Sequence, residues 1–328
     1  MKKRAFGKTG FDTSDVGLGC WQLGGFCWGD LDEAKAFDIL NTAVNSGVNF
    51  FDTADVYGEG RSETLIGAFL KQCPADIYIA SKLGRFPKPG WPANFTRDVM
   101  RQHIEASLDR LGIDALDLVQ LHCIPADVMA GGEVFDHLRE FKQEGLIKDF
   151  GASVESMDEA MLCMGQDGLA SLQVIFNVFR RKPITALFDT AAEKGVAIIA
   201  RVPLASGLLS GKISLDTQFP ENDHRKFNKD GEMFNVGETF AGLTLTTGLE
   251  AIDKIRPLVP QGMSMAQMSL RWILDHDAVS VVIPGASSAQ QVLDNCAVSD
   301  IDQLTAELHQ TLEDLYNTDV HEHIRGPY

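Results

Sequence analysis

The stretch of sequence that decides the fold runs from residue 47 to residue 60 and reads GVNFFDTADVYGEG. Its first part, residues 48–51, is a short apolar run typical of a buried strand. The run stops at Asp52, and Tyr57 follows among polar and turn-forming residues that predict a loop. A carboxylate and a phenol therefore stand together where one strand ends, and α/β enzymes place their reactive groups at such ends.

Two further strand-like runs end in polar residues in the same way. Residues 77–80 are apolar and are followed closely by Lys82, and residues 116–121 lead directly into His122. If the three strands are parallel neighbours, these two side chains meet Asp52 at one end of the sheet, with the phenol of the first loop beside them. The sequence thus predicts one polar site at the carboxyl ends of three strands.

Strand-like and helix-like runs alternate along the chain, which favours a parallel sheet covered by helices. Eight apolar runs predict strands at residues 16–18, 48–51, 77–81, 116–121, 150–153, 172–176, 196–200 and 279–283. This alternation predicts an α/β fold, a (β/α)8 TIM barrel. An open doubly wound sheet is the alternative, but no G-x-G-x-x-G turn follows the first strand, as that fold usually requires.

Three further features complete the predicted architecture. Residues 2–15 predict an N-terminal hairpin, and the helical pattern over residues 31–45 has Asp30 as its candidate N-cap. After the seventh strand comes a long polar loop, residues 212–238, which lacks periodicity and which we expect to cover the site. No linker rich in Pro, Gly or Ser divides the chain, so we expect a single domain over residues 1–328.

Composition excludes several classes of function. The formal net charge of -17 opposes binding to nucleic acid. No run approaches the ~18 apolar residues of a membrane helix, and the start of the chain lacks the apolar core of a secretion signal. The six cysteines form no C-x-x-C pair, and the histidines form no ligand pair at a strand end, so we expect no metal. A cytoplasmic protein without nucleic-acid or membrane partners fits this composition.

With these residues the chain resembles the aldo-keto reductase superfamily over nearly its full length. The motifs that carry the resemblance are DTADVYG at 52–58, the Ser81-Lys82 and Leu121-His122 pairs, RVPLASGLLSGK at 201–212 and IPGAS at 283–287. The resemblance implies a barrel that transfers a hydride, without a metal, from a nicotinamide cofactor to an aldehyde or ketone. That cofactor is usually NADPH, so we expect NADP(H).

The resemblance also implies a catalytic set of Asp52, Tyr57, Lys82 and His122. Tyr57 would donate the proton, and the Lys82 ammonium would lower its pKa from the ordinary value of about 10. Asp52 would hold Lys82 in place, and His122 would orient and polarise the carbonyl oxygen. Each residue alone also fits an ordinary packing or capping role, but all four together favour the site.

The resemblance further assigns residues to the cofactor and to the substrate. The cofactor set is Cys20, Trp21, Asp52, Ser153, Gln173, Arg201, Pro203, Leu204, Ser206, Leu208, Lys212, Gly285, Ser287, Gln291 and Asn295. The substrate pocket is Trp21, Tyr57, Phe86, His122 and Cys123. Two residues depart from the family pattern, since Val154 replaces a common Asn and Arg201 replaces an aromatic residue that lies against the nicotinamide.

The sequence leaves alternatives open for the cofactor preference and for the function. Ser287 and Ser288 offer hydroxyl groups to a 2′-phosphate, which favours NADPH, whereas Gln291 stands where some members carry Arg. The first hypothesis is a reductase of small carbonyl compounds. The second is a nicotinamide-binding sensor or regulatory subunit, like the family's potassium-channel β subunits. A metal-dependent barrel hydrolase is a weaker third.

Overall fold

The computed structural model describes residues 1–28 and 31–328, and within them eight strands form one parallel sheet in chain order. The strands are β3 (Leu18–Gly19), β4 (Phe50–Asp52), β5 (Tyr78–Leu83), β6 (Leu116–His122), β7 (Ile147–Ser153), β8 (Leu169–Ile175), β9 (Ala197–Arg201) and β10 (Val279–Val282). Parallel bridges from Val16 to Val282 and from Gly19 to Gly285 join the two edges of this sheet. The sheet therefore closes, and the predicted (β/α)8 barrel is confirmed.

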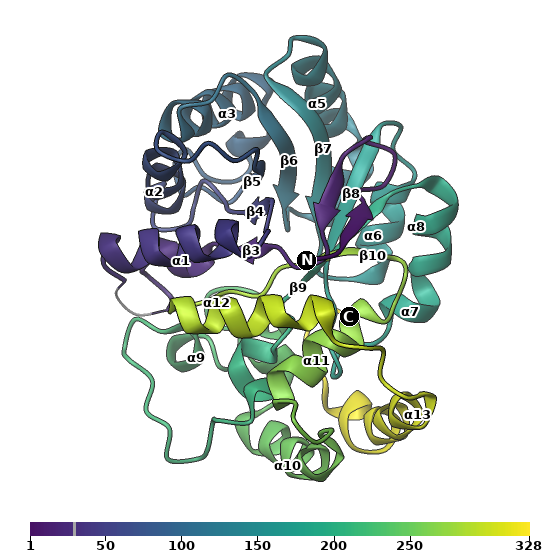
Figure 1. Ribbon diagram of the computed structural model, residues 1–328. Coiled ribbons are helices and arrows are strands. Elements are labelled where there is room, and N and C mark those ends of the chain that lie inside the picture. Colours follow the sequence, from purple (N-terminus) through teal and green to yellow (C-terminus); the bar gives the residue numbers. More distant parts are fainter. Residues whose placement is uncertain (29–30) are drawn as a thin grey trace.

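Helices connect the strands and lie around the outside of the sheet (Figure 1). They are α1 (Glu33–Asn45), α2 (Arg61–Leu70), α3 (Arg97–Leu111), α4 (Ala126–Gly131), α5 (Glu133–Gln143), α6 (Met157–Met164), α7 (Pro183–Ala186), α8 (Phe188–Lys194), α9 (His224–Phe227), α10 (Leu245–Ile255), α11 (Met265–Leu274), α12 (Ala289–Cys296) and α13 (Ala306–Leu315). The N-cap of α1 is Asp32, whose carboxylate accepts a hydrogen bond from the backbone of Lys35 (2.8 Å). The predicted cap, Asp30, lies outside the described residues.

The N-terminal hairpin closes one end of the barrel. Strands β1 (Lys3–Ala5) and β2 (Asp12–Ser14) pair antiparallel, as predicted, and lie against the barrel (Figure 1). Phe6 follows β1 and is fully buried among residues of the barrel interior, with its ring 5.4 Å from that of Phe50 and 5.5 Å from that of Tyr78. Because these partners lie at the amino ends of their strands, the hairpin leaves the carboxyl ends open for a site.

The long loop after β9 is folded against the loop that follows β3. Asp223 forms bridges with Cys27 and Trp28, and His224, at the start of α9, is fully buried against the ring of Trp28 (4.5 Å between centroids). The helix α9 has only four residues, which is too short to produce a periodic pattern in the sequence. The prediction of a loop here is confirmed, and the loop lies at the carboxyl ends of the strands.

Throughout the described part of the chain, every helix is too short or too polar to cross a membrane.

Candidate active site

The carboxyl ends of three neighbouring strands bring four polar side chains together. Asp52 ends β4, Lys82 lies near the end of β5, His122 ends β6, and Tyr57 stands in the turn after β4. The Lys82 ammonium donates to Asp52 Oδ2 (2.6 Å), to the backbone oxygen of Thr53 (2.8 Å) and to the Tyr57 hydroxyl (3.3 Å). The rings of Tyr57 and His122 lie edge to face, 5.7 Å apart. The structure thus shows the convergence that the strand ends predicted.

The Asp52 carboxylate is also held by two glutamine side chains. Its Oδ1 atom accepts hydrogen bonds from Gln120 Nε2 (3.1 Å) and from Gln173 Nε2 (2.7 Å), and the amide of Gln173 also donates to Gln120 Oε1 (3.1 Å). Gln120 was not predicted, although its position two residues before His122 in β6 puts both side chains on the same face of the strand. These contacts fix Asp52, and through it Lys82, before any ligand binds.

The Tyr57 phenol is a weak acid in this site. Its pKa is raised to about 12, with burial as the largest cause; the nearby Asp52 carboxylate also raises it, and Lys82 opposes both effects. Lys82 lowers this pKa, as expected, but burial outweighs its effect, so that the pKa of Tyr57 lies above the ordinary value. Burial by itself lowers the pKa of Lys82, but Asp52 and Tyr57 outweigh it and raise the pKa above its ordinary value. Tyr57 is thus neutral and Lys82 charged.

His122 is a neutral imidazole. Burial lowers its pKa well below the ordinary value, and the positive charges of Arg85, Lys82 and Arg201 lower it further. Its Nδ1 atom has no hydrogen-bond partner among the described residues. A neutral imidazole carries one N–H, so His122 can donate a hydrogen bond to an oxygen without being an acid itself.

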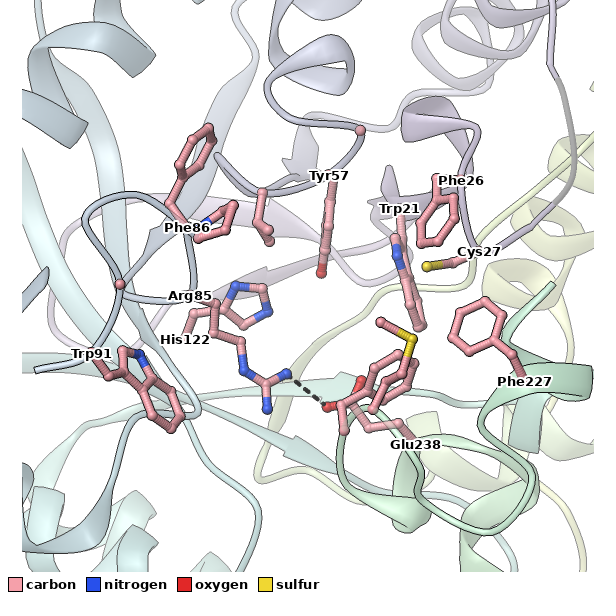
Figure 2. Close-up of a pocket in the computed structure, with 16 residues that line it drawn as sticks. Trp21, Phe26, Cys27, Tyr57, Arg85, Phe86, Trp91, His122, Phe227 and Glu238 are labelled. Carbon is pink, nitrogen blue, oxygen red and sulfur yellow. Dashed lines mark ion pairs between the residues drawn. The ribbon is translucent and has the colours of Figure 1, made fainter. Parts of the chain in front are cut away.

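A cluster of paired charges that was not predicted lies next to His122. Arg85 Nη2 is 3.1 Å from Glu155 Oε1, and Arg85 Nη1 is 3.6 Å from Glu238 Oε1 (Figure 2). Arg201 Nη1 is 3.4 Å from the same oxygen of Glu238, and Arg201 Nη2 donates to the backbone oxygen of Val154 (3.1 Å). Two guanidinium groups and two carboxylates therefore compensate each other. No sequence signal connects Glu238, in a stretch without periodicity, to these arginines.

One group of possible metal ligands overlaps this cluster. Within the described residues, the donor atoms of Cys123, Glu155 and Glu238 lie within 4.8 Å of one another. The same carboxylates are already paired with Arg85 and Arg201, and burial raises the pKa of the Cys123 thiol, so that it stays protonated. A cation would meet two guanidinium groups and a neutral thiol, which is a poor site for a metal.

The residues assigned to the cofactor follow several strands around the same end of the barrel. Cys20 and Trp21 follow β3, Ser153 ends β7, Gln173 lies in β8, Arg201 ends β9, and Gly285 and Ser287 follow β10. Two of these side chains already have partners within the protein. The amide nitrogen of Gln173 is bonded to Asp52, and Arg201 is paired with Glu238.

The turn after β9 offers a backbone amide to a phosphate group. Three consecutive residues, Ala205 (φ 48°), Ser206 (φ 55°) and Gly207 (φ 97°), adopt left-handed conformations. The nitrogens of Ala205 and Gly207 donate to Val202 O (3.1 Å) and Leu204 O (2.9 Å), so that of these three amides only that of Ser206 has no partner among the described residues and can serve an anion. The Ser206 hydroxyl is used within the protein, since it donates to the backbone oxygen of Glu238 (2.8 Å) and accepts from Phe240 N (3.2 Å). Leu208 is buried, so the turn offers mainly backbone.

The segment after β10 offers a second place for a phosphate. Ser288 caps α12, and the side chain of Gln291 accepts hydrogen bonds from the backbone nitrogen (2.7 Å) and the hydroxyl (3.1 Å) of Ser287. The start of a helix attracts negative charge, and these serines are exposed there. Lys212 is exposed and Asn295 is buried on α12. The donors at both places fit a phosphate-bearing nucleotide.

A cavity of about 440 Å³ opens onto Tyr57 and His122 (Figure 2). Trp21 and Phe86 line it as predicted, whereas Cys123 is not part of its lining. The other residues around it come mainly from the loops after β3, β5 and β9. They are Phe26, Cys27, Val56, Gly58, Arg85, Pro87, Gly90, Trp91, Phe227, Met233, Phe234 and Glu238.

Comparison with known proteins gives a consistent result. The model of the aldo/keto reductase family matches residues 15–317. The chain is 30% identical to the uncharacterized oxidoreductase YqkF of Bacillus subtilis over 98% of both chains, and 28% identical to the NADH-specific methylglyoxal reductase of Escherichia coli over 94% of this chain and 96% of that one. The solved structure of the aldo-keto reductase AKR11C1 from Bacillus halodurans, in its holo form, is 30% identical over 96% of both chains, with a TM-score of 0.78.

Proposed function

The chain belongs to the aldo/keto reductase family, whose members are oxidoreductases that act on carbonyl compounds with a nicotinamide cofactor, and we propose that it is an NADPH-dependent reductase of aldehydes and ketones. The observation that carries this proposal is the chain of contacts from Asp52 through Lys82 to Tyr57, whose phenol opens onto a cavity of substrate size. NADPH, when bound, supplies the hydride.

The four polar residues have distinct roles in this proposal. The carbonyl oxygen accepts a hydrogen bond from the neutral His122, which fixes its position and polarises the carbonyl group. As that oxygen gains negative charge, the protonated Tyr57 hydroxyl gives it a proton, so that an alcohol forms. The phenolate that remains is stabilised by the Lys82 ammonium 3.3 Å away, and Asp52 keeps that ammonium in place. Lys82 therefore acts on the product side of the proton transfer.

The preference for NADPH over NADH is supported by the hydroxyl groups of Ser287 and Ser288 at the start of α12. The exposed Ser288 hydroxyl suits a 2′-phosphate, and that of Ser287 does so once it gives up its hydrogen bond to Gln291 (3.1 Å), while the exposed Lys212 adds positive charge. The Escherichia coli relative carries the name of an NADH-specific enzyme, so the preference needs a direct measurement. A fluorescence titration should give tighter binding of NADPH. Equal affinity for the two cofactors would contradict this part of the proposal.

The substitution Tyr57→Phe tests the catalytic assignment. The phenyl ring keeps the packing, but the proton donor is lost, so turnover should fall by the roughly 10² to 10⁴ that acid catalysis supplies. The affinity for NADPH should hardly change, because the phenol faces the substrate cavity. Turnover is followed by cofactor absorbance with a panel of carbonyl compounds. A Tyr57→Phe protein with the parent rate would remove the assignment.

Lys82→Met provides the matching variant for the same assay. It removes the ammonium beside Tyr57, and turnover should again fall strongly. The double variant should be little worse than either single one, because both residues serve one proton transfer. If the parent protein binds NADPH but reduces no carbonyl compound at all, the protein is better explained as a nicotinamide-binding sensor or regulatory subunit than as a reductase.

A further inference from the structure

The cavity above Tyr57 and His122 has an unusually aromatic lining. Six aromatic side chains besides Tyr57 surround it: Trp21, Phe26, Phe86, Trp91, Phe227 and Phe234. They come from three separate loops, so the aromatic character is not a property of one segment. Substrate sites combine such apolar walls with a few placed polar groups, and here the polar pair is Tyr57 and His122. The walls therefore suit an apolar body attached to the reacting carbonyl group.

Three apolar side chains at this cavity are exposed to solvent. Phe26 is 54%, Trp91 is 51% and Met233 is 67% exposed, and all three line the same cavity. Figure 2 shows Trp91 and Phe26 on opposite sides of Tyr57. Large apolar side chains that remain exposed around one opening indicate a ligand that covers them. An aldehyde of three carbon atoms bound at Tyr57 and His122 would leave these side chains in water.

The charged residues of the lining are already paired. Among the described residues that line the cavity, Arg85 is the only arginine or lysine, and it contacts both Glu155 (3.1 Å) and Glu238 (3.6 Å). Glu238 also contacts Arg201 (3.4 Å). A carboxylate on the substrate would have to displace Glu238 to reach a free cation, because Glu155 and Glu238 already neutralise the two guanidinium groups. The cavity thus offers no free positive charge to an anion.

We propose that the substrate is an uncharged carbonyl compound with a bulky aromatic body, and that Glu238 excludes carboxylated substrates by occupying Arg85 and Arg201. This inference rests on the reductase function proposed above. It makes Glu238 a residue that determines specificity, with no part in the proton transfer. It also assigns Phe26 and Trp91 to the binding of the substrate's distal part.

The charge selectivity is tested with two substrates that differ in one charge. The anion 4-formylbenzoate and its neutral methyl ester carry the same reacting aldehyde. We expect the parent to favour the ester at least tenfold in kcat/KM, and Glu238→Gln to reduce this preference about tenfold because it frees the guanidinium groups. Glu221→Gln is the control, since it removes the same charge from the same loop while its partner, Lys226, lies outside the cavity. A Glu238→Gln protein with the parental preference would overturn the role of Glu238.

The size selectivity is tested with benzaldehyde and 2-naphthaldehyde, two neutral aryl aldehydes. We expect kcat/KM to be at least tenfold higher for the larger compound, since its second ring buries further apolar surface. The ratio of the two values should fall at least threefold in Phe26→Ala and in Trp91→Ala. Met161→Ala, which removes another exposed apolar side chain (44%), on α6 and outside the cavity lining, should leave the ratio at the parental value.

The outcomes separate this inference from the function on which it rests. A parent that reduces both aldehydes in a Tyr57-dependent manner, but with equal kcat/KM or a preference for benzaldehyde, would overturn the inference and leave the reductase function standing. A parent that reduces neither compound, nor any other carbonyl, would remove the reductase function and the inference with it. Melting temperatures of the variants identify any loss that comes from unfolding.

Discussion

Asp55 shows at the scale of one residue how burial changes a titratable group. It lies between Asp52 and Tyr57, is fully buried, and neither carboxylate oxygen has a hydrogen bond within the described residues. Its pKa is raised to about 8, chiefly by burial and also by the charge of Glu63, while Arg110 and Lys82 oppose the shift. His103 Nδ1 is 3.5 Å from its Oδ2 atom. Near neutral pH this carboxyl group is therefore largely protonated.

This pKa has a consequence for stability that Asp55→Asn should reveal. In the unfolded chain the carboxyl group has a pKa near ~3.9, so the folded protein binds the extra proton between about pH 4 and pH 8. The extra proton stabilises the folded protein fully below about pH 4, and this stabilisation is lost as the pH rises toward 8. Between pH 5 and pH 8 the parent should lose on the order of 4 kcal/mol of unfolding free energy relative to Asp55→Asn. Urea unfolding of both proteins at the two pH values measures this difference. An equal change in unfolding free energy for the parent and for Asp55→Asn would contradict the prediction.

At the scale of elements, the loops after β3 and β4 fix the position of Tyr57 by direct backbone contact. Gly58 has φ 61°, and a Cβ atom there would lie 2.2 Å from the backbone oxygen of Gly24. This close approach places the ring of Trp21 against that of Tyr57, with 5.9 Å between their centroids. The glycine is thus required by space as well as by conformation.

We therefore expect Gly58→Ala to reduce activity as well as stability. The two loops must separate to accept the methyl group, and Tyr57 moves with its loop, so kcat/KM should fall tenfold or more. Gly10→Ala is the control, because Gly10 also has a positive φ (80°) but open space around it, so that only the conformational cost remains. Steady-state kinetics and urea midpoints of both variants compare the effects. Equal losses of activity would show that the loop contact does not position Tyr57.

At the scale of the whole molecule, the barrel separates stability from chemistry at its two ends. The hairpin and Phe6 close the amino end, and the polar site lies at the carboxyl end. Phe6→Ala should cost about 3 to 5 kcal/mol of unfolding free energy by leaving a cavity, whereas Phe6→Leu should cost much less. Denaturant unfolding measures both, and KM should stay near its parental value. A large change in KM would mean that the two ends are coupled.

Whether a feature could be predicted from the sequence depends on how close together its residues lie in the chain. The strands and the convergence of Asp52, Lys82 and His122 follow from local patterns, because an apolar run and its polar end are adjacent in the chain. The pairing of Arg85 with Glu238 depends on how two irregular loops fold against each other, and no periodicity records that contact. The high pKa of Tyr57 depends on burial, which the sequence indicates only after the loops are placed. The fold and the convergence of these polar side chains were therefore accessible from the sequence, but the electrostatics and the cavity walls were not.

The unequal sides of the cavity have a consequence for the handedness of the product. In the proposed reaction Tyr57 and His122 hold the carbonyl oxygen at one point. Trp21, Phe26 and Phe227 lie on one side of Tyr57, and Arg85, Phe86 and Trp91 lie on the other (Figure 2). A ketone with one aryl and one small substituent then has one favourable orientation, with its aryl group toward Trp21, Phe26 and Phe227 and away from the guanidinium of Arg85. Only one of its two faces is turned toward the incoming hydride in that orientation. Reduction of such a prochiral ketone should give predominantly one enantiomer of the secondary alcohol, which chiral chromatography resolves.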